Sequence, residues 1–152
     1  MTIQLSSILT PSRVICGLDG ISKKRALETV AKLIAEDIPV LDAEELFRRL
    51  MARERLGSTG IGNGIAIPHC RLENCTGTLG AFFKLNDRLD FDAIDDQPVD
   101  NIFALLVPEE ADDSHLQTLA AIAKFFTNPE LLSQIRQCQS SSQLYEILIS
   151  AG

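Results

Sequence analysis

The chain lacks an apolar run long enough to cross a membrane. Its longest uninterrupted apolar stretch in the middle of the chain is IFALLV, at 102–107, whereas a membrane-spanning helix needs ~18 or more such residues. Residues 1–14, MTIQLSSILTPSRV, also lack the basic start and sustained apolar core of a secretory leader. We therefore expect a cytoplasmic protein with no direct membrane insertion.

Basic residues are also in short supply. The chain has 14 lysines and arginines against 21 aspartates and glutamates, for a net charge of −7. Nucleic-acid-binding proteins carry a basic surface, so we expect no nucleic-acid partner. The acidic residues concentrate at 86–101 and 108–113. They either form a solvated surface or border a contact with a basic partner protein.

The four cysteines do not form the paired short spacings of a structural zinc site. Cys70 and Cys75 lie close to His69, but the number of ligands that a metal needs is not visible there. Cys16 and Cys138 are isolated. We therefore expect no metal, and reduced, partly buried thiols.

The chain does carry alternating helix and strand signals. Ser22 is a predicted helix cap, and Asp42 with Glu45 forms a predicted capping box. Helices are predicted at 22–36, 42–56, 112–126, 129–138 and 141–150, and strands at 65–69, 79–85 and 99–107. The continuous apolar run at 99–107 is typical of a strand in a sheet that is covered on both faces. The pattern therefore predicts an α/β sandwich, and 152 residues predict one domain.

The most unusual segment is GSTGIGNGIAIPH, residues 57–69, which ends in one of only two histidines. Four glycines in eight positions suggest that something approaches the main chain closely. No lysine follows them, so a Walker-type nucleotide loop is excluded. The order helix, glycines, strand excludes a dinucleotide fingerprint. The net charge argues against a nucleic-acid clamp, and no nucleophile elbow is present.

Two polar side chains are predicted to point inward at helix ends. Arg53 shares a helix face with Leu46 and Leu50, one turn before the glycines. His115 lies on the apolar face of the helix predicted at 112–126, in its first turn. Arg53 could instead snorkel or pair with a carboxylate, and His115 could be an ordinary core residue.

A histidine that itself accepts a group accounts for these placements together. Neutral imidazole is nucleophilic at physiological pH. A phosphoryl group would need backbone amides, hydroxyls and a cation around it. Arg53 could supply the cation, and His115 could hydrogen-bond a phosphoryl oxygen. The amides and hydroxyls could come from the loop residues Gly57, Ser58, Thr59, Gly60, Gly62 and Gly64.

Residues 53–69, RERLGSTGIGNGIAIPH, resemble the active-site signature of fructose/mannitol-type IIA domains of the bacterial phosphoenolpyruvate-dependent phosphotransferase system. The segments FDAIDDQPVDNIFALLVPEE at 91–110, HLQTLA at 115–120 and SKKRALE at 22–28 resemble its free-standing nitrogen-regulatory branch. The resemblance spans nearly the whole chain. It implies one IIA-type domain over 1–152, an α/β fold with a mixed β-sheet flanked by helices on both faces, and no cofactor.

The resemblance also implies roles for individual residues. His69 would accept a phosphoryl group on Nε2 from a histidine phosphocarrier protein, so the chain is an enzyme only in the limited sense of a phosphohistidine carrier. Arg53 and His115 would line the site, and Ser58 and Thr59, with the amide of Gly60, would contact the phosphoryl group. Cys70 stands where a small residue such as glycine is expected.

Two uses of such a carrier are open at this point. A regulatory protein would change its partners with its phosphorylation state, affecting nitrogen, carbon or potassium metabolism. A sugar-transport IIA component would pass the group to a IIB domain. The absence of a fused domain or membrane span favours the regulatory protein. A third reading, a binding module with a structural histidine, leaves the glycine-rich loop unexplained.

Overall fold

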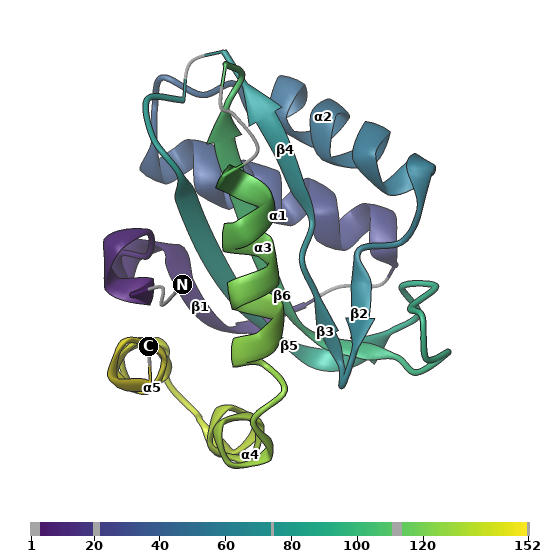
Figure 1. Cartoon of the computed structure of the whole chain (residues 1–152), viewed down its shortest axis with the longest axis vertical. Coiled ribbons are helices and arrows are strands. Elements are labelled where there is room, and N and C mark those ends of the chain that lie inside the picture. The colour runs from purple at the N-terminus through teal and green to yellow at the C-terminus, as the bar shows by residue number, and fades with distance from the viewer. Residues whose placement is uncertain (1–3, 20–21, 74, 111–113, 152) are drawn as a thin grey trace.

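A mixed sheet of six strands lies between two layers of helices in the computed structural model of this chain (Figure 1). The structure describes residues 4–19, 22–73, 75–110 and 114–151, so the acidic start predicted for the helix at 112–126 lies outside the described residues. The elements run in the order η1 (Leu5–Ser7), η2 (Pro11–Arg13), β1 (Val14–Leu18), α1 (Lys23–Asp37), α2 (Ala43–Leu56), β2 (Gly60–Gly62), β3 (Ile65–Ala66), β4 (His69–Leu72), β5 (Leu79–Leu89), β6 (Val99–Pro108), α3 (Ser114–Phe125), α4 (Pro129–Gln137) and α5 (Ser141–Ala151).

Helix starts follow the predicted capping residues. The Ser22 hydroxyl accepts a hydrogen bond from the Arg25 amide, and the Asp42 carboxylate accepts one from the Glu44 amide. Asn128 caps α4 in the same way. These side chains satisfy amides that have no partner inside the helix. The carboxylate of Glu45 does not face back along the helix as a capping box predicts but pairs with Arg48 and Arg49.

The strand order is β1-β5-β6-β3-β2, with β4 also paired to β6. The pairs β1–β5, β3–β6 and β4–β6 are parallel, whereas β5–β6 and β2–β3 are antiparallel. α3 crosses one face of the sheet, and α1 and α2 lie against the other (Figure 1). The predicted α/β fold with helices on both faces is confirmed.

β6 explains why two helix layers are needed. Ile102, Ala104 and Leu106 belong to the hydrophobic core under α1 and α2. The alternating residues Phe103, Leu105 and Val107 belong to the core under α3, α4 and α5. A strand with apolar side chains on both faces is stable only when both faces are covered.

The strand prediction was incomplete in two places. β1 and β2 were not predicted, since β1 follows a 3-10 turn and β2 contains only Gly60, Ile61 and Gly62. The single strand predicted at 65–69 is divided between β3 and β4, because Pro68 has no amide hydrogen to continue the ladder. β4 resumes at His69, and this break places the histidine at the start of a strand.

Candidate functional site

His69 is the first residue of β4, a strand at the edge of the sheet (Figure 1). It lines a hollow together with residues from the end of α2 and the start of α3. It pairs in register with Leu105, which belongs to the core on the α3 side. Side chains alternate along a strand, so His69 and Arg71 project to the same side. Cys70 projects to the other, where it is buried against α1 and α2.

The two ring nitrogens of His69 have different partners. Nδ1 lies 2.8 Å from the carbonyl oxygen of Ile67, which can only accept a hydrogen bond. Nδ1 therefore carries the proton of the neutral ring, and Nε2 keeps a free electron pair. Arg53 Nε donates to Nε2 at 3.3 Å. The geometry thus presents a nucleophilic nitrogen beside a permanent positive charge.

Burial lowers the pKa of His69 below its ordinary value, and the charges of Arg53 and His115 lower it further, while Glu54 and the Ile67 carbonyl oppose the shift. The ring is consequently neutral at physiological pH. Neutral imidazole is the form that can attack an electrophile.

A hollow of about 510 Å³ opens in front of the His69 ring. Its lining includes the guanidinium groups of Arg49, Arg53 and Arg71 and the rings of the two histidines. Leu56 and Leu116 stand at its border with 85% and 55% of their surfaces exposed. A protein with a net charge of −7 therefore has a cationic hollow with an apolar border beside His69.

The structure brings the predicted trio Arg53, His69 and His115 together around this hollow. The guanidinium group of Arg53 donates from Nε to the His69 ring and from Nη1 to the Gly57 carbonyl at 2.9 Å. It therefore binds groups of the site and does not extend into solvent. His115 is half-buried beside the hollow, with its Nδ1 3.5 Å from Arg71 Nη2. Guanidinium groups only donate, so Nδ1 of His115 accepts that contact.

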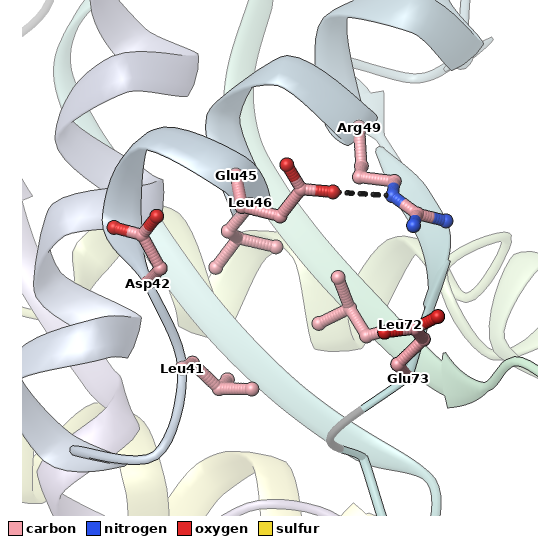
Figure 2. Close-up of a pocket in the computed structure, with 7 residues that line it drawn as sticks. All are labelled: Leu41, Asp42, Glu45, Leu46, Arg49, Leu72 and Glu73. Carbon is pink, nitrogen blue, oxygen red and sulfur yellow. Dashed lines mark hydrogen bonds and ion pairs between the residues drawn. The ribbon is translucent and has the colours of Figure 1, made fainter.

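Arg49 and Arg71 line the hollow but were not singled out from the sequence. Their spacing contained the signal, because Arg49 lies one helical turn before Arg53 and Arg71 lies two residues after His69 on a strand. Arg49 is held by Glu45, whose carboxylate accepts from Arg49 Nε at 2.8 Å, as Figure 2 shows. The hydrogen bonds from Arg49 and Arg48 lower the pKa of Glu45.

Arg49 lines the histidine hollow and also a smaller pocket of about 130 Å³, which Figure 2 shows. The smaller pocket is lined by carboxylates of Asp42, Glu45 and Glu73 among leucines. Carboxylates repel an anionic group, so an anion fits the arginine-lined hollow at His69 better than this smaller pocket.

The glycines of the loop serve the chain's own turn. Asn63 and Gly64 both have positive φ, 59° and 78°, as the two central residues of the hairpin between β2 and β3. A Cβ on Gly64 would lie 2.4 Å from Asp100 Oδ1, and one on Gly60 would lie 2.7 Å from the Ala93 Cβ. The close approach that the sequence suggested is therefore made by neighbouring protein segments.

The donors of Ser58, Thr59 and Gly60 already have acceptors within the protein. The Ser58 hydroxyl donates to the Phe91 carbonyl at 2.6 Å, and the Gly60 amide donates to the Ser58 hydroxyl at 3.0 Å. The Thr59 amide and hydroxyl both donate to Glu54. A contact with a phosphoryl group would require these donors to exchange partners, and this role stays a prediction.

Glu54 is a buried charged residue beside the site that was not predicted from the sequence. Its side chain is 2% exposed and forms an ion pair with Lys23 Nζ at 2.7 Å. A signal was present, because an acid in the last turn of a helix is unfavourable with the helix dipole and needs a compensating contact.

Cys70 has no nucleophilic role in this arrangement. Burial raises the pKa of its thiol to about 12. Within the described residues, no group of three or more histidine, cysteine, aspartate or glutamate side chains could hold a metal ion. In the same part of the chain, none of the helices has the length and apolarity that crossing a membrane requires.

Comparison with known proteins identifies the family to which this chain is similar. The family described as phosphoenolpyruvate-dependent sugar phosphotransferase system, EIIA 2, matches residues 7–151. A nitrogen regulatory protein of Pseudomonas aeruginosa is 46% identical over 147 residues, which cover 97% of this chain and 96% of that protein. A nitrogen regulatory protein of Escherichia coli is also 46% identical, over 152 residues covering 97% and 90% of the two chains.

A solved structure agrees with the sequence relatives. The nitrogen regulatory protein IIA-Ntr of Neisseria meningitidis superposes with a TM-score of 0.86 at 36% identity, over 95% of this chain and 98% of that chain. The match is full-length in both directions, so the sheet, both helix layers and the edge that carries His69 all lie within the shared fold.

Proposed function

Because the chain belongs to the EIIA 2 family of the phosphoenolpyruvate-dependent sugar phosphotransferase system, we propose that it is a phosphoryl carrier whose acceptor atom is Nε2 of His69. The observation that carries this proposal is the contact between that nitrogen and Arg53 Nε, 3.3 Å apart in an open hollow. The donor is a histidine phosphocarrier protein. The chain is a transferase in the limited sense that it holds the group between two partners.

The chemistry follows from the ring's hydrogen bonds. The electron pair on His69 Nε2 attacks the phosphorus of the donor's phosphohistidine and forms a new N–P bond. The old N–P bond breaks, and its electron pair stays on the donor's ring nitrogen. Positive charge develops on the His69 ring during this step, and the Ile67 carbonyl stabilises it through the hydrogen bond from Nδ1.

Arg53 changes partner during the transfer. Before the reaction its Nε donates to Nε2 of His69, and afterwards the new N–P bond occupies that electron pair. The guanidinium group then lies beside the phosphoryl oxygens and neutralises their charge. His115 also lines the hollow and donates a second hydrogen bond to the same group.

The phosphoryl group would also change what the surface around His69 binds. It adds about −1.5 to −2 charges at pH 7 to a cationic hollow bordered by Leu56 and Leu116. A partner with an apolar, acidic surface would bind the unphosphorylated form and be repelled by the phosphorylated one. The names of the full-length relatives support nitrogen-related regulatory targets. Outputs in carbon and potassium metabolism rest on the sequence resemblance alone.

The alternative use is sugar transport. The family description names sugar phosphotransferase systems, so the group on His69 could pass to a IIB domain. The two uses differ in one observable step, since a transport component discharges its phosphoryl group onto IIB in the presence of sugar and a regulatory protein does not.

The test is intact mass after incubation with phosphoenolpyruvate, the first enzyme of the system and its phosphocarrier. We expect one acid-labile phosphoryl group on the wild type and none on His69→Ala. His115→Ala keeps the acceptor nitrogen and serves as the matched histidine control, which should gain the same phosphoryl mass but more slowly. An unmodified wild type, with a carrier shown to be active on another IIA protein, would contradict the proposal.

A further inference from the structure

Glu54 occupies a place that the phosphoryl-transfer mechanism does not explain. It is a carboxylate with a 2% exposed side chain in the last turn of α2, next to Arg53. Its partner Lys23 is the first residue of α1. Both positions oppose the helix dipole, which favours cations at the C-terminus of a helix and anions at its N-terminus. The ion pair between them offsets this cost but does not explain why a buried charge is present there.

The hydrogen bonds of Glu54 lead toward His69. The Thr59 amide donates to Glu54 Oε1 at 3.1 Å and to Oε2 at 3.3 Å, and the Thr59 hydroxyl donates to Oε1. The Thr59 carbonyl accepts from the Ile67 amide at 2.9 Å. The Ile67 carbonyl then accepts from His69 Nδ1 at 2.8 Å. Glu54 thus holds Thr59, Thr59 holds Ile67, and Ile67 holds the ring of His69.

Arg53 links the other end of this series of hydrogen bonds back to α2. This residue precedes Glu54 on α2 and donates to the other nitrogen of the His69 ring. Its Nη1 donates to the Gly57 carbonyl, so the loop between α2 and β2 is held at Gly57 by Arg53 and at Thr59 by Glu54. The His69 ring is therefore held between two neighbouring residues of one helix, one in direct contact and one through the loop.

We propose that Glu54 is a positioning residue that holds Thr59 and thereby places the Ile67 carbonyl where it keeps the proton of His69 on Nδ1 and the electron pair on Nε2. Glu54 does this without touching the phosphoryl group or the partner protein, because its side chain is enclosed by Thr59 and Lys23. The inference rests on the proposed role of His69 as acceptor.

Glu54→Gln is the informative substitution because it keeps the size of the side chain. The glutamine carbonyl can accept from Thr59, but its amide group then faces the Lys23 ammonium, donor against donor. The segment from Gly57 to Thr59 would shift, and the Ile67 carbonyl with it. Glu28→Gln is the matched control, since Glu28 is an exposed carboxylate on α1 that pairs only with its helix neighbour Arg25 among the ion pairs of the described residues.

The first measurement is the long-range ¹H–¹⁵N spectrum of the histidine rings, which distinguishes a protonated from an unprotonated ring nitrogen. The chain has only two histidines, so His69→Ala assigns the signals. We expect a protonated Nδ1 and an unprotonated Nε2 in the wild type and in Glu28→Gln. In Glu54→Gln both nitrogens should move toward the averaged shifts of a ring that exchanges between its two tautomers.

The second measurement is the kinetics of phosphorylation by the carrier. A misplaced acceptor should lower the maximal rate about ten- to a hundredfold, while the KM for the carrier stays the same because Glu54 is not on the surface. If Glu54→Gln does not fold, Thr59→Val removes the hydroxyl donor, keeps the amide donor and should give smaller changes in the same direction. Ring-nitrogen shifts that stay at the wild-type values in a folded variant would overturn the proposal, whatever its rate.

The two proposals fail in different ways. If the wild type accepts no phosphoryl group, the carrier function is contradicted, while the histidine-ring spectra of Glu54→Gln still test the role of Glu54. A wild type that is phosphorylated, with unchanged spectra in Glu54→Gln, contradicts the role of Glu54 alone.

Discussion

Replacing Arg53 with alanine removes a guanidinium group that contacts the proposed acceptor atom. The lost contact is the donation from Arg53 Nε to His69 Nε2 at 3.3 Å, which would move to a phosphoryl oxygen as the N–P bond forms. Such a charge-assisted hydrogen bond contributes about 1.5–3 kcal/mol. At about 1.4 kcal/mol for each factor of ten, this corresponds to a rate loss of about 10- to 150-fold. The hollow is open to solvent, which favours the lower half of that range.

The substitution should have a second effect that the assay must separate. The positive charge of Arg53 contributes to the lowered pKa of His69, after burial, so Arg53→Ala should raise that pKa. At pH 8 the ring is neutral in both proteins, and the rate ratio reports only the lost contact. Below pH 7 the ratio should widen, because more of the variant's ring is protonated.

The assay is a time course of intact mass with limiting phosphocarrier at pH 8 and pH 6. Arg55→Ala, an exposed arginine in the same helical turn, is the control for loss of one positive charge. It should keep the wild-type rate at both pH values. A wild-type rate in Arg53→Ala at pH 8 would refute the assigned role, and an equal loss in both variants would show that general charge, and not the contact, matters.

Three further predictions concern stability and reactivity. His69 has a folded-state pKa below its unfolded value of 6.5, so its contribution to stability is complete above that pH and is lost as the pH falls through the folded pKa. Urea unfolding should therefore show the wild type losing free energy of unfolding relative to His69→Gln between pH 7.5 and 5, and a constant difference would contradict this. Gly64→Ala forces a side chain into positive φ, at about 1–2 kcal/mol, and against Asp100. Denaturant titration should show at least that loss, whereas Gly77→Ala, where a Cβ meets nothing within 4 Å, should change stability little. The Cys70 thiol, buried and with a pKa raised to about 12, should resist iodoacetamide at pH 8 until the protein is unfolded. Mass mapping of the alkylated peptides checks this, and rapid labelling in the folded state would be the contrary result.

Local signals allowed much of the helix layer to be predicted. Ser22 and Asp42 begin α1 and α2 as expected, because a cap acts through amides two or three residues away. The continuous apolar run of β6 also predicted a sheet covered on both faces. Glu45 is predicted to complete a capping box at the start of α2, but its carboxylate pairs with Arg48 and Arg49 one turn further along the helix. The side chain of Glu45 is long enough to reach in either direction.

The missed strands depend on partners far along the chain. β1 pairs with β5, and β2 becomes a strand only through its hairpin with β3. Neither segment has an apolar alternation of its own to predict a strand. The division of the predicted strand at 65–69 follows from Pro68, which has no amide hydrogen to donate to the ladder.

The sequence by itself determined the acceptor candidate and its class of chemistry. His69 follows an uncommon run of glycines in a chain with only two histidines. Helical periodicity places Arg53 and His115 on the apolar, inward-pointing faces of their helices. Only the tertiary structure decided which nitrogen of His69 keeps the electron pair, because the Ile67 carbonyl and Arg53 reach the ring from a bend in the sheet edge and from a separate helix. It also decided that the glycines form a hairpin turn, that Glu54 is buried, and that Arg49 and Arg71 join the site. Sequence periodicity reports which way a side chain points, whereas a site is made by side chains from different elements that meet only when the sheet and both helix layers have assembled.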